Sequence, residues 1–199
     1  MSARRALAAA LAAAVLLAGC GGDSDSPSPP PRQAEKADSV PQLPKAWEVH
    51  TNRGGGFTFG LPPGWKARNH GTTTEVRSYD GLVVLSIAAD RTTEALSVDP
   101  ADAATRTLAS LPGFERAPDP SEPRELEHEY VAYEADANAR SAASGVEQDL
   151  TVVVLRREGA VSVTVLIAAN ADKRSRAARR IADRVVSTLR TQPPRGAAR

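Results

Sequence analysis

The spacing of apolar residues predicts strands in the first half of the chain. Phe57, Phe59 and Leu61 are apolar while the positions between them are polar or small, and this two-residue period is typical of a strand with one buried face. Residues 72–78 predict a second strand, and the apolar run 81–89, GLVVLSIAA, predicts a third.

A turn separates the first two of these strands. Pro62 cannot continue a central strand. Pro63 presets φ and Gly64 accepts a positive φ, so this pair suits the centre of a type II turn. Trp65 then returns the chain to the apolar side.

Three long strands are expected in the second half. They cover residues 124–136, 146–157 and 160–169, the last two centred on LTVVVL and on VSVTVLIAA. Glu158-Gly159 between them predicts a tight hairpin.

Two segments have the features of helices. Asp99 is a good N-cap, Pro100 fits the first helical position, and Pro112-Gly113 ends the segment. Residues 172–190 predict an amphipathic helix. Its expected buried stripe is Ala178, Ile181, Ala182, Val185, Val186 and Leu189.

The order of elements predicts the fold class. Short strands, a helix, three long strands and a final helix indicate an antiparallel β-sheet with helices packed on it, an α+β fold. Residues 45–190 have the length of one domain, and the chain holds 199 residues.

The first twenty residues differ from this pattern. Arg4 and Arg5 precede an unbroken apolar stretch, 6–17, which is typical of a secretory signal and too short for a permanent membrane span. The next residues, Leu17-Ala18-Gly19-Cys20, resemble the lipobox of bacterial lipoprotein precursors. The resemblance implies cleavage between Gly19 and Cys20 and a diacylglyceryl group on the Cys20 sulfur.

This resemblance implies a location. Two acyl chains give stable membrane attachment, at about 0.8 kcal/mol per buried methylene, so we expect a lipid-anchored protein on the extracytoplasmic side of the cell membrane. Cys20 is the only cysteine, so it has no partner for an internal disulfide. The alternative is an ordinary secreted protein. Arg4-Arg5 leaves twin-arginine export open, although general secretion fits the surrounding residues better.

Composition divides the rest of the chain. We expect residues 1–19 to be the signal peptide and 20–44 to be the lipidated cysteine with a disordered Pro/Ser-rich tether. Residues 191–199 are expected to form a disordered tail. Removal of the signal would leave 23 basic against 24 acidic residues, a net charge of −1, which does not indicate a nucleic-acid partner.

The opening GFTFGLPPGW and the order of elements resemble the PsbP-like fold. That fold covers the photosystem protein PsbP, a Ran-binding nuclear import factor and actinobacterial lipoproteins of the LpqN type. The resemblance implies an α/β/α sandwich over residues 47–190 that serves as a binding or accessory module without a common active site. The lipobox favours the lipoprotein branch.

Motifs for catalysis, metals and cofactors are missing. Gly54-Gly55-Gly56 lacks both the spacing and the position of a phosphate-binding loop. His128 stands between Glu127 and Glu129, but an extended strand would send it to the face opposite these acids. No Gly-x-Ser-x-Gly elbow occurs. We therefore expect no catalytic residue, no metal and no cofactor.

The last predicted helix is strongly basic. Arg179, Arg180 and Arg184 flank its apolar stripe without joining it, and such residues could contact an anionic surface. The alternative is a solvated outer face.

Three functional hypotheses remain. The preferred one is a non-catalytic binding module of the cell envelope, whose partner is an envelope protein, a wall polymer or a small apolar ligand. A surface hydrolase or other enzyme is the alternative, and a deep pocket with converging ionisable groups would favour it. The third is a passive spacer or surface antigen.

Overall fold

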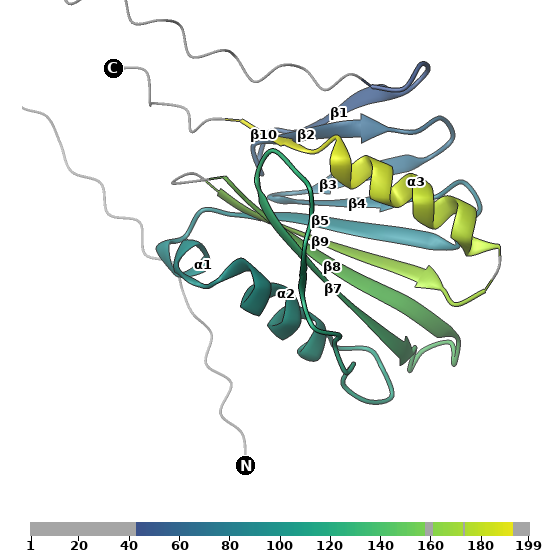
Figure 1. Ribbon diagram of the computed structural model, residues 1–199. Coiled ribbons are helices and arrows are strands. Elements are labelled where there is room, and N and C mark those ends of the chain that lie inside the picture. The colour runs from purple at the N-terminus through teal and green to yellow at the C-terminus, as the bar shows by residue number, and fades with distance from the viewer. Residues whose placement is uncertain (1–42, 158–160, 173, 193–199) are drawn as a thin grey trace, which may run out of the picture. The chain divides into compact units, whose positions relative to one another are not determined.

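The computed structural model describes residues 43–157, 161–172 and 174–192. The predicted signal peptide, Gly19, Cys20, most of the tether, the hairpin at 158–159 and most of the C-terminal tail lie outside the described residues. The part described holds two antiparallel sheets and three helices (Figure 1).

The larger sheet has seven strands, all antiparallel to their neighbours. In spatial order these are β3 (Lys66–His70), β4 (Thr73–Arg77), β5 (Val83–Asp90), β9 (Val161–Asn170), β8 (Glu147–Arg157), β7 (Val131–Arg140) and β6 (Arg124–Glu125). The smaller sheet is ordered β1 (Glu48–Asn52), β2 (Phe57–Leu61) and β10 (Arg190–Thr191). The helices are α1 (Thr93–Ser97), α2 (Pro100–Ala109) and α3 (Ser175–Ser187).

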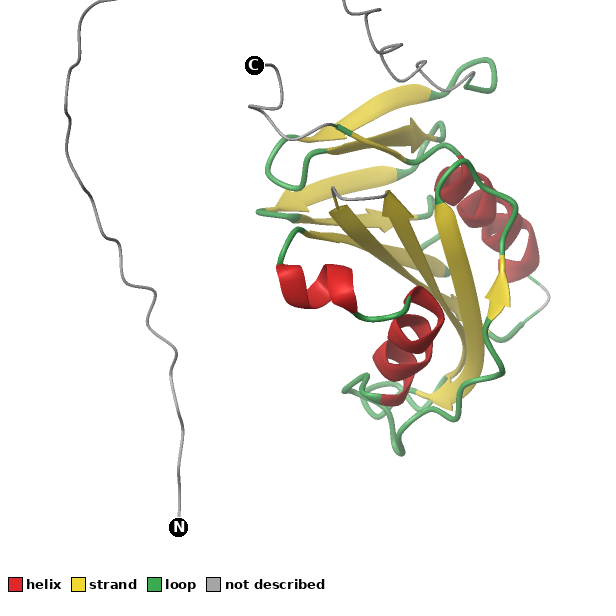
Figure 2. Cartoon of the chain, turned by 60° about the vertical axis from the view of Figure 1, so that its left-hand side comes forward, coloured by secondary structure: helices red, strands yellow, loops and turns green. Residues whose placement is uncertain are grey.

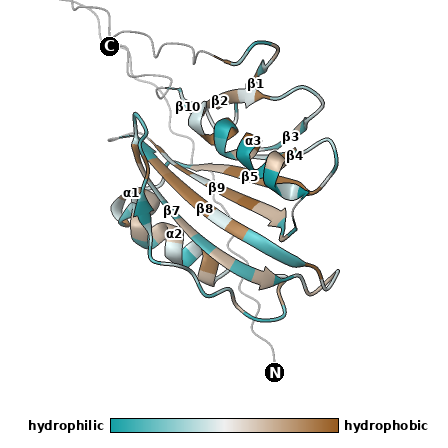
Figure 3. Ribbon diagram, turned by 45° about the vertical axis from the view of Figure 1, so that its right-hand side comes forward, coloured by the Kyte–Doolittle hydropathy of each residue, from teal (hydrophilic) through white to brown (hydrophobic). Residues whose placement is uncertain are grey.

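Helices cover the larger sheet on both faces, as Figure 2 shows. Successive residues in the middle of β8, which lies between β9 and β7, are buried and mostly apolar for this reason (Figure 3). Val152 and Val154 pack with α2, whereas Val153 and Leu155 belong to the core under α3. A buried side chain of this size contributes about 1.5–3 kcal/mol relative to an exposed one.

The α3-side core is the larger of the two. It joins the inner faces of β5 and β9 to Phe57 and Phe59 of β2 and to Ala178, Ala182 and Val185 of α3. The α2-side core is smaller and rich in alanine. Ala104 and Leu108 of α2 pack there on alternate residues of β7 and β8.

Side-chain amides connect the smaller sheet to the larger one. Asn52 of β1 is 1% exposed. Its Nδ2 donates to the Thr73 carbonyl (3.1 Å) and to Thr74 Oγ1 (2.9 Å), and its Oδ1 accepts from the Gly55 N–H (2.8 Å). A Cβ atom added at Gly54 would lie 2.6 Å from the Gly71 carbonyl oxygen, so close packing accounts for a glycine in this turn.

The predicted fold class is confirmed. The antiparallel sheet with packed helices is an α+β fold, and α2 begins as predicted, with Asp99 Oδ1 accepting from the Ala101 N–H (2.9 Å) and Pro100 at the first position. Gly64 has φ +78°, and the Trp65 N–H donates to the Pro62 carbonyl (3.2 Å), which closes the predicted turn.

The predicted strand 124–136 is wrong. It is a hairpin in which β6 turns back and pairs with β7, Arg124 opposite Glu134. The turn is closed by the Leu126 N–H, which donates to the Ala132 carbonyl (2.9 Å), and by the Tyr130 N–H, which donates to His128 Nδ1 (3.1 Å). His128 is therefore in a loop and does not alternate with its acidic neighbours along a strand.

Several short elements were not predicted. They are β1, β3, β10 and α1. Strand β10 ends at Thr191, which is buried, one residue past the domain boundary expected at 190. Among the helices of the described segments, none is long and apolar enough to cross a bilayer.

Candidate binding cleft

A cleft opens between α3 and the end of the larger sheet, with a volume of about 260 Å³. We call it the α3–β7 cleft. Its lining residues come from β6, β7, β8, α3 and the loop that joins β6 to β7. They are Arg124, Leu126, Glu127, His128, Glu134, Val153, Arg179, Asp183, Val186 and Ser187.

The apolar part of the cleft is a continuation of the core. Val153 points to the α3 side of β8, and Val186 belongs to the buried face of α3. Leu126 is partly buried against the same cluster. An apolar group placed here would lose contact with water and meet side chains that are already desolvated.

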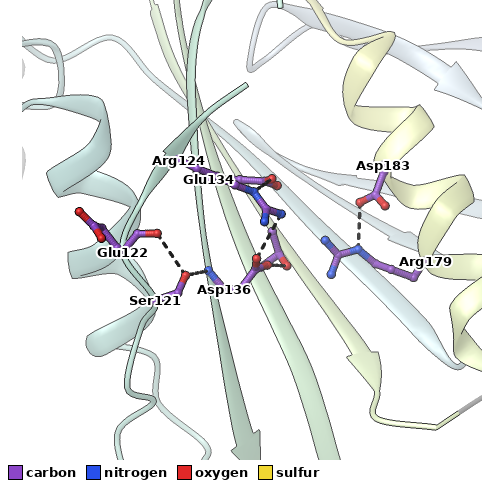
Figure 4. A network of polar contacts seen from close by, with 8 residues as sticks. Ser121, Glu122, Arg124, Glu134, Asp136, Arg179 and Asp183 are labelled. Carbon is purple, nitrogen blue, oxygen red and sulfur yellow. Dashed lines mark hydrogen bonds and ion pairs between the residues drawn. The ribbon is translucent and has the colours of Figure 1, made fainter. Parts of the chain in front are cut away.

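One wall of the cleft consists of paired charges on β6 and β7 (Figure 4). Arg124 Nε donates to Glu134 Oε1, and Arg124 Nη2 lies 3.3 Å from Asp136 Oδ2. Glu134 is only 8% exposed, and a buried carboxylate requires such a partner. The hydrogen bond that Arg124 donates to Glu134 raises the pKa of Arg124, and the charges of Asp136 and Asp183 add to this effect.

Further contacts fix the position of Asp136. Its carboxylate accepts a hydrogen bond from Thr151 Oγ1. Its backbone N–H donates to Ser121 Oγ (3.0 Å), and its carbonyl accepts from the Ser121 N–H (2.7 Å), as Figure 4 shows in part. Charged groups held in this way are organised before any ligand arrives.

The opposite wall belongs to α3. Arg179 Nε donates to Asp183 Oδ1 (2.9 Å) one turn along the helix. The Arg179 side chain is mostly buried, while that of Asp183 is half exposed. The cleft thus has an ion pair on each side of an apolar centre.

The loop from 127 to 130 closes one end. Its position is set by Glu129, which pairs with Arg190 (3.0 Å), and by Tyr130, whose hydroxyl accepts from the Thr191 N–H (3.4 Å). Burial lowers the pKa of His128, and the nearby charge of Arg190 lowers it further. The imidazole is therefore neutral near pH 7, with Nδ1 used as an acceptor by the backbone.

The arrangement is suited to binding. Ser187 Oγ donates to the Arg184 carbonyl (2.8 Å). The described residues hold no group of three His, Cys, Asp or Glu that could ligate a metal ion. Paired charges around an apolar centre can orient a bound ligand.

The three arginines predicted to contact an anionic surface do not share one site. Arg179 lines the α3–β7 cleft, whereas Arg180 and Arg184 lie on the other flank of α3. There they border a second depression of about 310 Å³, which we call the Trp–Arg hollow. Its other lining residues are Trp47, Pro62, Pro63, Trp65, Tyr79 and Ile181.

Sequence reasoning missed the charged wall of the cleft. The segment YEADANA holds Glu134 and Asp136 two residues apart in a strand, and this places both on one face. That signal could have been read from the sequence. Their pairing with Arg124 could not, because it depends on the hairpin that the chain forms at residues 126–130.

No protein-family model and no curated protein sequence matches the chain. Solved structures do resemble it. The Ran-binding protein Mog1p of Saccharomyces cerevisiae has a TM-score of 0.53 at 12% identity, over 73% of this chain and 95% of that one. A protein from Bacteroides thetaiotaomicron has a TM-score of 0.51 at 12% identity, over 73% of this chain and 48% of that one.

A further structure is that of LpqN, which is involved in cell envelope biogenesis of Mycobacterium tuberculosis. Its TM-score is 0.44 at 15% identity, over 69% of this chain and 83% of that one. The likeness to Mog1p shows a shared fold. This shared fold agrees with the α+β arrangement that the resemblance to PsbP-like proteins implies. The proteins of that fold include a Ran-binding protein.

Proposed function

We propose that the chain is a lipid-anchored protein on the extracytoplasmic side of the cell membrane and that its domain acts by binding an envelope protein. The lipobox-like Leu17-Ala18-Gly19-Cys20 supports the anchor. The observation that carries the binding role is the α3–β7 cleft, with its apolar centre and its two ion pairs. Mog1p, which shares the fold, is itself a Ran-binding protein.

The size of the cleft favours a protein partner. Its 260 Å³ is below the roughly 300–1,000 Å³ of sites that enclose a drug-sized molecule. One or two side chains of a partner would fill it, as buried anchors do at protein interfaces. An apolar side chain would lie on Val153 and Val186, and polar groups beside it would meet Arg179 or Glu134.

The anchor is tested by labelling cells with a fatty-acid probe. We expect the wild-type chain to be labelled, and Cys20→Ala to lose the label because the acylated sulfur is gone. Ser24→Ala, four residues further on, is the control and should behave like the wild type. Labelling of the alanine variant would refute acylation at Cys20.

The binding role is tested by crosslinking in intact membranes. Ser187→Trp places an indole at the exposed rim of the cleft. Ser97→Trp makes the same change on α1, which covers the other face of the sheet (Figure 2). We expect the same envelope protein to be recovered with the wild type and with Ser97→Trp, and to be lost with Ser187→Trp. Equal recovery from all three would contradict the assignment of the cleft.

One observation favours an enzyme as a second candidate. Arg124, His128, Glu134 and Asp183 converge on a single cleft, and clusters of ionisable groups are frequent in active sites. The test is to assay the purified chain for esterase and glycosidase activity. An activity that is lost in both Asp183→Asn and His128→Gln, and kept in His70→Gln, would establish the enzyme. If no substrate distinguishes the wild type from these two variants, the enzyme hypothesis is rejected.

A further inference from the structure

The Trp–Arg hollow is separate from the α3–β7 cleft. It lies on the other flank of α3 and is built from segments far apart in the sequence. Trp47 comes from the start of the described chain, Pro63 from the β2–β3 turn and Tyr79 from the β4–β5 turn. Figure 1 shows α3 running beside β2. None of the residues that line the α3–β7 cleft also lines the hollow.

Charge distinguishes the two flanks of α3. Arg180 and Arg184 are one helical turn apart and exposed, and neither side chain has an ion pair or hydrogen bond with any of the residues described. Arg179, on the cleft side, pairs with Asp183. No acidic residue lines the hollow. The carboxylate of nearby Asp80 is occupied within its own turn, accepting from Ser78 Oγ (2.6 Å) and the Leu82 N–H (3.1 Å).

Aromatic side chains complete the hollow. Tyr79 is 74% exposed, and Trp47 is half-buried. Tyrosine and tryptophan gather where an apolar phase meets water, because the ring is apolar and its polar tip remains hydrated. Unpaired arginines beside exposed aromatics therefore have the composition of a surface that contacts lipid headgroups.

The path of the chain leads from the proposed anchor to this hollow. Trp47 follows Cys20 by only 27 residues, and its N–H donates to the Pro44 carbonyl (3.0 Å) where the described chain begins. A chain of this length reaches at most roughly 90–100 Å. The anchor would keep the domain at a high local concentration near the bilayer, where a weak contact suffices.

From these observations we infer that the Trp–Arg hollow rests on anionic phospholipid headgroups. The guanidinium groups of Arg180 and Arg184 donate to phosphate oxygens, and Trp47 and Tyr79 lie at the interface. The inference relies on the proposed function only in that the lipid anchor brings the domain to the membrane.

The test uses the non-acylated full chain with Cys20→Ser and lipid vesicles whose headgroups carry a spin label that quenches tryptophan. Because residues 1–19 would enter any bilayer, the readout is local: quenching of Trp47, with Trp47→Phe giving the signal of Trp65. We expect quenching with vesicles that contain phosphatidylglycerol, little with phosphatidylcholine alone, and a loss of quenching at high salt.

Two double variants distinguish lipid binding by the hollow from a general effect of the positive charge of the domain. Arg180→Gln with Arg184→Gln should lower the ratio of quenched to unquenched Trp47, measured at saturating lipid, by about 30-fold, from about 1 kcal/mol per arginine. Arg106→Gln with Arg116→Gln removes the same charge from α2 and the loop beyond it and should have little effect. Equal losses in both variants, or equal quenching with neutral lipid, would overturn the proposal.

A different occupant would give a different result. If Trp47 is quenched only after Pro29, Pro30 and Pro31 are replaced by glycine, the proline-rich segment fills the hollow and the proposal fails. The vesicle experiment involves no acylation. A negative fatty-acid label would therefore count against the anchor alone, and a negative quenching result would count against the hollow alone.

Discussion

At the scale of single residues, Asn52 connects the two sheets through two hydrogen bonds, to Thr73 and Thr74 of β4. A third hydrogen bond, from the Gly55 N–H, holds the β1–β2 turn. Loss of a buried partner leaves polar groups unsatisfied, which costs about 1–3 kcal/mol per group.

We therefore predict that Asn52→Ala lowers the free energy of unfolding by about 2–3 kcal/mol. Urea unfolding followed by circular dichroism measures this. Asn138→Ala, an exposed asparagine in β7, is the control and should change the value by less than about 0.5 kcal/mol. Equal effects of the two substitutions would mean that the hydrogen bonds of Asn52 contribute nothing to the stability of the domain.

His128 makes the stability of the domain depend on pH. Its pKa is lowered in the folded state by burial and by Arg190, while Glu129 and the Val186 backbone act in the opposite direction. The unfolded chain therefore binds a proton more readily than the folded one. The full stability is present above the unfolded pKa of about 6.5 and decreases as the pH falls from there through the folded pKa.

We predict that His128→Gln makes unfolding less sensitive to pH below about 6.5, because glutamine does not titrate yet can still accept from the Tyr130 N–H. Unfolding free energies measured at neutral and mildly acidic pH give the difference. His70→Gln, at an exposed position in β3, should leave the wild-type dependence intact. A wild-type pH dependence in His128→Gln would show that this group is not responsible.

At the scale of elements, the β2–β3 turn depends on one backbone conformation. Gly64 has φ +78°, and a Cβ atom there would meet Tyr79 Cβ at 3.6 Å, which is an ordinary contact. A side chain at this position would therefore destabilise the turn through the backbone conformation and not through a clash. The positive φ lies in the left-handed region, which only glycine adopts freely.

Gly64→Ala should lower the free energy of unfolding by about 1–2 kcal/mol, and Gly64→Asn should cost less because asparagine tolerates this region better. Thermal or urea unfolding of the two variants gives the order. The prediction is wrong if asparagine is as costly as alanine, since steric crowding would then be the cause.

The sequence predicts best those elements whose signals are local. Helix α2 has its cap at Asp99 and its proline at Pro100, and both act within one turn. The segment 124–130 is different, because its tyrosine, leucine and alternating residues favour a strand, yet the chain turns back at His128. Short strands such as β10 depend on a partner more than 120 residues away, Thr58 opposite Arg190, so no local pattern indicates them.

The candidate sites could also be predicted only as far as their signals are local. Basic residues on α3 were visible from helical spacing, but which flank each arginine occupies depends on packing. Arg179 pairs with Asp183 at the cleft, while Arg180 and Arg184 line the hollow together with Trp47 and Tyr79. Those aromatic residues come from segments whose positions relative to α3 are set by the tertiary structure.

At the scale of the whole molecule, the two cores share their central strands. β8 and β9 contribute to the clusters on both faces of the sheet, so loss of one cluster should weaken the other. The only two tryptophans of the chain, Trp47 and Trp65, pack on the α3-side cluster. Their fluorescence therefore reports on one face alone.

We predict that Leu108→Ala, on the α2 side, lowers the urea midpoint seen by tryptophan fluorescence as much as that seen by circular dichroism. The expected loss is about 3 kcal/mol. Ala109→Ser changes an exposed position of the same helix and should leave both midpoints in place. A fluorescence midpoint that does not move in Leu108→Ala would mean that the two faces unfold independently.

The smaller sheet brings together the beginning and the end of the folded part. Strands β1 and β10 flank β2. Strand β1 begins at Glu48, opposite Leu61, and β10 ends at Thr191, opposite Phe57. With adjacent strands about 4.8 Å apart and a rise of about 3.4 Å per residue along a strand, these two ends are separated by roughly 17 Å. A circular permutant that joins the two ends by a short linker and opens at the exposed turn around Ser144 would retain every strand pairing in a new sequence order.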